Sequence, residues 1–119
     1  HALEPRFPAL RALSADDVEF EVTTESDDDA PEDHFSDRRD SAYIRKRLEA
    51  GDDAAWCIVV VTARWNGFKG WASLGRCSLS DDYTEDTVVS EHDMKQEALD
   101  HLNQNIKAQL DKLAPLLKR

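Results

Sequence analysis

The alternation of apolar and polar residues predicts a β-hairpin in the middle of the chain. Residues 56–65 and 68–79 are rich in the β-branched and aromatic side chains that favour strands. Asn66-Gly67 stands between them and suits a two-residue hairpin turn, because both residues tolerate positive φ. We therefore expect the two segments to pair as antiparallel strands.

A two-residue turn fixes which residues of the two strands lie opposite each other. The expected pairs are Trp65 with Phe68, Ala63 with Gly70, Val61 with Ala72, Val59 with Leu74, and Cys57 with Arg76. These side chains share one face, which is mostly apolar and includes small residues that leave room for a helix. In this register Cys57 and Cys77 project from opposite faces, so we expect two free thiols.

The opposite face of the hairpin is only half polar. Its apolar members are Trp56, Ile58, Val60 and Trp71. Either this face is covered by the N-terminal segment, the first helix or a second subunit, or it binds a separate partner. Because aromatic residues on strands usually belong to a core, we prefer burial within the molecule or in a dimer.

The remaining elements follow from the same kind of pattern. Residues 18–23 alternate apolar with acidic or polar side chains and predict a half-buried strand with an acidic outer face. A first helix is expected over about 36–50, and a long C-terminal helix with one continuous apolar stripe over about 90–114. The acidic segment 80–89 is expected to be a linker.

The predicted order of elements is strand, helix, strand, strand, helix. This order indicates an α+β fold: a three-stranded antiparallel sheet with the long C-terminal helix packed across the hairpin. Residues 15–119 have a length that suits one domain. Residues 1–14 carry Phe7, Leu10 and Leu13 at spacings of three, and they form either a docked helical turn or a loose terminus.

Acidic residues are strongly clustered in this chain, which has a formal net charge of −10. Eleven acidic residues and no lysine or arginine occur in 14–37, and six more occur in the basic-free segment 80–93. The first cluster predicts an acidic interaction surface made of Glu19, Glu21, Glu25, Asp27, Asp28, Asp29, Glu32 and Asp33. The net charge argues against nucleic acid or an anionic membrane as the main ligand and favours a basic protein partner.

Side chains suited to catalysis or metal binding are sparse. The histidines at 1, 34, 92 and 101 include no pair at the i, i+4 spacing of a helical metal site. Neither acidic cluster has the glycine and glutamate positions of an EF-hand calcium loop. We therefore expect no metal site, no cofactor and no enzymatic activity.

Apolar runs are short throughout the sequence. None approaches the roughly 20 residues of a membrane span, and Pro5, Arg6 and Pro8 interrupt the early apolar stretch that a signal peptide would need. Two cysteines do not form a disulfide framework. These features favour a cytoplasmic location.

The hairpin carries a distinctive frame of residues. It reads Trp56-Cys57, then Ala63-Arg64-Trp65, then Leu74-Gly75-Arg76-Cys77-Ser78. This frame resembles a group of small hypothetical proteins from bacteriophages and prophages, although Arg76 and Leu79 stand where those proteins tend to have glycine and tyrosine. The resemblance implies a phage or mobile-element origin and a host-cell location, and it brings no activity with it.

The leading hypothesis is a non-catalytic acidic protein that binds a basic host protein. Carboxylates at i and i+2 of a strand lie about 6.6 Å apart. Such a row resembles nucleic-acid phosphates, so the protein could inhibit an enzyme as a mimic of the anti-restriction or anti-CRISPR type. Mimicry requires that no cation of the chain itself neutralises these carboxylates.

Other classes of function remain open at this point. One is a structural or virion-associated protein that forms a homodimer through the sheet face of Trp56 and Trp71. Another is an acidic surface that serves only solubility or halophilic adaptation. An enzyme has the least support, because the sequence lacks a cluster of catalytic side chains.

Overall fold

The computed structural model describes residues 11–116 and has the α+β fold expected from the sequence. Its strands are β1 (Glu19–Ser26), β2 (Cys57–Trp65) and β3 (Phe68–Cys77). Its helices are α1 (Pro31–His34), α2 (Arg38–Glu49), α3 (Glu85–Glu91) and α4 (Met94–Leu113), with short 3₁₀ turns η1 (Ala15–Asp17), η2 (Asp53–Ala55) and η3 (Ala114–Leu116).

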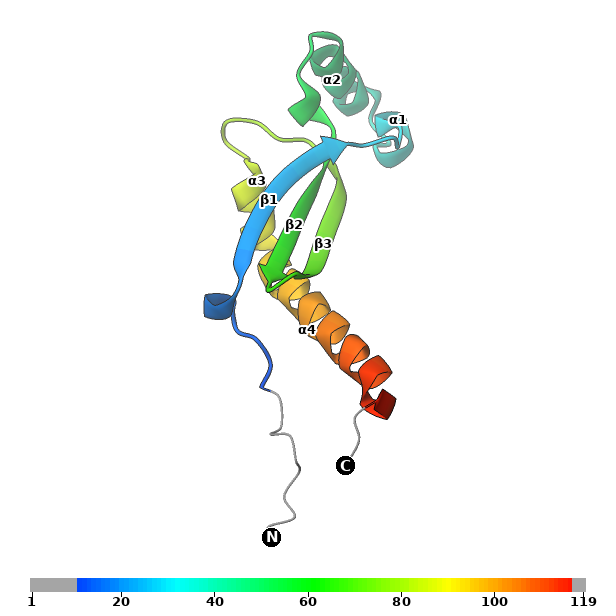
Figure 1. The fold of residues 1–119 in the computed structure, drawn as a ribbon. Helices are drawn as coiled ribbons and strands as arrows, with labels where there is room; N and C mark the ends of the chain where they lie inside the picture. Colours follow the sequence, from blue (N-terminus) through cyan, green and yellow to red (C-terminus); the bar gives the residue numbers. More distant parts are fainter. Residues whose placement is uncertain (1–10, 117–119) are drawn as a thin grey trace.

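The three strands form one antiparallel sheet in the order β1-β2-β3. α4 packs on β2 and β3, and α3 packs on β1 and β2, so both helices cover the same face (Figure 1). α1 and α2 lie beyond one end of the sheet, while α4 runs out past the hairpin turn at the other end. The opposite face of the sheet therefore has no helix packed on it within the described residues.

The hairpin turn and most of its register are confirmed. Asn66 and Gly67 have φ values of 49° and 88°, as a type I′ turn requires. Strands β2 and β3 pair as predicted from Trp65–Phe68 to Val59–Leu74. The prediction that small residues leave space for a helix is confirmed at Gly70, because the backbone of α4 lies directly against this residue.

The register prediction is wrong at the far end of the hairpin. A bulge shifts β3 by one residue, so that Cys57 lies opposite Cys77 rather than opposite Arg76. Arg76 has a positive φ of 57°, and its backbone N–H donates to the carboxylate of Asp27 at 2.6 Å. The bulge therefore depends on Asp27, which follows the end of β1, and the hairpin sequence alone does not reveal this contact.

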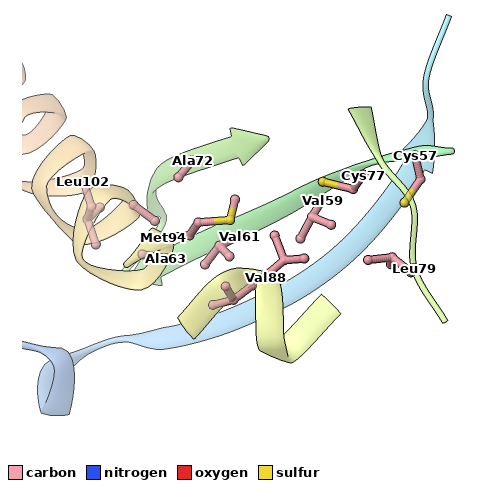
Figure 2. Packing of buried hydrophobic residues seen from close by; sticks show 12 residues of the cluster. Cys57, Val59, Val61, Ala63, Ala72, Cys77, Leu79, Val88, Met94 and Leu102 are labelled. Carbon is pink, nitrogen blue, oxygen red and sulfur yellow. The ribbon is translucent and has the colours of Figure 1, made fainter. Parts of the chain in front are cut away.

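Both cysteines consequently lie on the buried face of the sheet (Figure 2). The prediction that they project from opposite faces is wrong, whereas the two thiols are free as expected. Burial raises the pKa of the Cys57 thiol to about 11, and it also raises the pKa of Cys77. These cysteines are packing residues of the core rather than reactive thiols.

The C-terminal helical region is divided, contrary to the single helix expected from Ser90. Thr84 caps α3 by accepting a hydrogen bond from the backbone of Thr87, so the predicted linker already contains a helix. Val88 and Val89 of α3 are buried in the core. Asp93, with a left-handed φ of 50°, separates α3 from α4.

The segment before η1 docks on α4 where the structure describes it. The backbone N–H of Leu13 donates to the side-chain oxygen of Asn103 at 2.8 Å, and the amide nitrogen of Asn103 donates back to the Leu13 carbonyl at 3.1 Å. The expected helical turn with Phe7 and Leu10 lies outside the described residues.

Candidate functional site

The candidate site is the face of the sheet that points away from α3 and α4, which we call the open face. Residues directly opposite each other on neighbouring strands of an antiparallel sheet share a face. The cross-strand rows of the open face are Glu19–Arg64–Lys69, Glu21–Thr62–Trp71, Thr23–Val60–Ser73 and Glu25–Ile58. The acidic and the apolar surfaces, which the sequence suggested separately, are therefore neighbours on one face.

Trp71 is the large aromatic side chain of the open face and is 53% exposed. One side of its ring is held by α4, since the His101 ring lies edge-on at a centroid distance of 4.3 Å. Ile58 and Val60 are half-buried on β2, in the following rows of the same face. The result is a partly apolar strip with an anchored aromatic ring, a composition typical of the centre of an interface.

Trp56 does not belong to this strip, so the prediction that it forms part of an apolar interface is wrong. It is only 3% exposed and packs with Ile44 and Leu48 of α2 and with Phe35. Its indole nitrogen donates to the backbone oxygen of Asp29 at 2.7 Å. Trp56 is thus covered by α2, which is the first helix expected from the sequence and one of the coverings that the sequence left open.

The glutamates of β1 form the acidic border of the open face. All three are exposed, and Glu21 pairs with Arg64 at 3.1 Å. Within residues 11–116, Glu19 and Glu25 take part in no ion pair. The border therefore keeps a net negative charge next to the apolar strip.

The acidic loop after β1 is used mainly for structure. Asp29 pairs with Arg76 at 3.0 Å, and Asp27 accepts backbone hydrogen bonds from Asp29 and Arg76. Arg45 donates two hydrogen bonds to Glu32, at 2.6 and 2.9 Å, and lowers the pKa of that carboxyl to about 2. These carboxylates stabilise the bulge and the α1–α2 corner.

The condition for nucleic-acid mimicry is consequently not met. Arginines of this chain neutralise three of the eight carboxylates in the predicted acidic surface, namely Glu21, Asp29 and Glu32. Asp28 and Asp33 are exposed, but they lie in the loop and α1 and not on the open face. The predicted single surface without any neutralising cation is wrong.

Elsewhere the described part of the chain offers little for chemistry. A hollow of about 880 Å³ lies beside α1 and α2, where Arg45 and Glu32 already pair with each other. No group of three or more His, Cys, Asp and Glu side chains in residues 11–116 is placed to hold a metal ion. The helices of this part of the chain are also too short or too polar to span a bilayer.

Comparison of the chain with protein-family models, curated proteins and solved structures gives no match. The resemblance to phage and prophage proteins, with the host-cell location it implies, therefore stays a prediction.

Proposed function

We propose that this protein is a non-catalytic binding protein that docks a basic protein surface on its open face. The proposal rests mainly on one observation. The β1 glutamates and the exposed Trp71 belong to the same uncovered sheet face, and Glu21 and Trp71 lie in the same cross-strand row. Charge and aromatic surface together suit a protein interface better than either would alone.

The two parts of this face have different tasks in binding. Trp71, Ile58 and Val60 supply apolar area at the centre, where burial contributes most of the affinity. Glu19 and Glu25 lie at the border, where charges attract a basic partner and speed association more than they tighten the complex. We therefore expect affinity to fall as salt is added.

We do not extend the proposal to nucleic-acid mimicry, because Glu21, Asp29 and Glu32 are paired with arginines of the chain. A homodimer through Trp56 and Trp71 also has weaker support, because Trp56 lies in the core. An arginine-rich protein segment with apolar residues between its cations fits the open face better than either alternative.

The test compares two triple variants that lose the same charge. One replaces Glu19, Glu21 and Glu25 by glutamine, and its matched control replaces three exposed glutamates of the helices: Glu49, Glu85 and Glu97. Binding of a peptide with alternating arginine and valine is measured by calorimetry at low salt. We expect the β1 variant to bind about 10-fold more weakly, because rim charges contribute less than about 1 kcal/mol each.

The control variant should retain affinity to within about 3-fold. Trp71→Ala should weaken binding of a partner that also covers β3, which lies about 10 Å from β1 across β2. Equal losses in the two triple variants would show that the peptide responds only to net charge. That result would contradict the proposed function.

A further inference from the structure

The two edges of the sheet differ in whether their outward backbone groups have partners. On the β3 edge, the backbone N–H of Trp71 donates to the His101 imidazole at 3.0 Å. The carbonyl of Lys69 accepts from the side-chain amide of Asn105 at 2.8 Å. Side chains of α4 thus occupy two of the outward hydrogen-bonding groups of this edge, which hinders strand pairing there.

The register shows which groups of β1 point outward. In a two-residue hairpin the residues flanking the turn exchange hydrogen bonds, and every second pair along the ladder does the same. The pairs Val61–Ala72 and Ala63–Gly70 therefore bond β2 to β3, so the alternate residues of β2 bond to β1. The β1 residues whose N–H and C=O groups face outward are then Phe20, Val22 and Thr24.

These outward groups of β1 have no hydrogen-bond partner within residues 11–116. Phe20 and Val22 are half-buried and Thr24 is exposed, so none of the three residues is fully buried. The open edge of this eight-residue strand is a template for another strand, whereas the opposite edge of the sheet is partly occupied by α4.

We propose that the outer edge of β1 binds an extended basic segment of a partner protein as a fourth strand of the sheet. This inference rests on the proposed function and specifies how the partner is held. Glu19, Glu21 and Glu25 bond inward to β2, so they would occupy the non-hydrogen-bonded positions of the new ladder, where facing side chains are closest. A segment with Arg or Lys at every second position places a cation opposite each of these three glutamates, with Thr23 at the remaining position of the row.

Charge complementarity favours this occupant over a second copy of the chain. The outward groups of β1 belong to even-numbered residues, namely Phe20, Val22 and Thr24. When two β1 strands pair antiparallel through these groups, the numbers of any two facing residues must therefore add up to an even number. The registers with the most overlap then place Glu25 of one copy opposite Glu19 or Glu21 of the other. Like charges directly opposite each other destabilise a strand pair, whereas arginines opposite the same glutamates stabilise it.

The experiment uses an eight-residue blocked peptide of alternating arginine and valine in two backbone-methylated forms. In the bound strand, valine N–H groups would face β1 and arginine N–H groups would face solvent. Methylation of the valine nitrogens is expected to weaken binding at least 10-fold. Methylation of the arginine nitrogens, with the same charge and size, should change affinity by less than about 3-fold.

A protein variant tests the same edge from the other side. Thr24→Pro removes an outward N–H without breaking the ladder to β2, and proline is tolerated at such edge positions. It should weaken the unmodified peptide at least 10-fold, whereas Thr24→Ala should change affinity by less than about 3-fold. Circular dichroism checks that both variants fold. If Thr24→Pro does not fold, the methylated peptides still test whether the peptide pairs with the β1 edge.

The outcomes separate this inference from the proposed function. If glutamine at 19, 21 and 25 weakens binding but both methylated peptides bind alike, strand addition is overturned and side-chain docking remains. If no form of the peptide binds with salt-dependent affinity, both are overturned. A dimer of the free protein that Thr24→Pro abolishes would overturn the inference by showing that a second copy occupies the edge.

Discussion

Trp56→Ala is expected to lower the free energy of unfolding by about 3–4 kcal/mol. Trp56 is 3% exposed and joins α2 to the end of the sheet through its contacts with Ile44 and Leu48. The substitution leaves a large cavity and also removes the indole hydrogen bond to the backbone of Asp29. Urea unfolding followed by circular dichroism measures the change without depending on tryptophan fluorescence.

Trp71→Ala is the matched control, because it removes the same side chain from the open face. With 53% of its surface exposed, Trp71 should contribute less than about 1 kcal/mol to folding stability. Its loss should instead weaken binding of a partner that covers the open face as far as β3. A similar loss of stability in the two variants would contradict the assignment of Trp56 to the core and of Trp71 to the surface.

Gly70→Ala is expected to destabilise the protein by about 3 kcal/mol, and to lower Tm by about 10 °C or more. A Cβ at this position would lie 2.5 Å from the carbonyl oxygen of Ala98 and closer still to the amide nitrogen of Leu102. Both atoms belong to the backbone of α4, so no side chain can rotate to make room. The helix would have to move off β3, which would also disturb the partly occupied β3 edge.

Gly75→Ala makes the same substitution on the same strand, where the nearest atom to a new Cβ is a carboxylate oxygen of Asp27 at 3.0 Å. This oxygen also accepts from the backbone N–H of Arg76, but it belongs to a side chain and needs to move by only a few tenths of an ångström, so we expect a smaller cost of about 1 kcal/mol. Thermal unfolding of both variants measures the difference. Equal effects would show that the close contact between α4 and Gly70 is not what positions the helix.

Much of the fold could be predicted because local signals agreed with one another. The Asn66-Gly67 turn set the register, and the small residue at Gly70 indicated the surface on which α4 lies. The bulge at Arg76 could not be predicted in this way, because a distant carboxylate, Asp27, accepts its N–H. The start of α3 was missed for a related reason: its short turn depends on the burial of Val88 in the core.

The candidate site was predicted in pieces. The sequence indicated acidic residues on the first strand and apolar residues on the hairpin, but it did not show that β1 pairs with β2. That pairing places Glu21 and Trp71 in one row. Asp29 is neutralised by Arg76 of β3, 47 residues away, and Glu32 by Arg45 of α2, 13 residues away. The composition of the acidic segment alone therefore overestimated the free acidic surface.

A titration of the isotope-labelled protein with the arginine–valine peptide, followed by amide NMR shifts, shows directly where the peptide binds. We expect the largest shifts in Glu19–Ser26 of β1, smaller shifts in the facing residues of β2, and a decline of both as salt is added. Shifts concentrated in the second acidic segment, 80–93, or along α2 would show that the peptide binds elsewhere. Either pattern would contradict the assignment of the open face and the β1 edge as the binding surface.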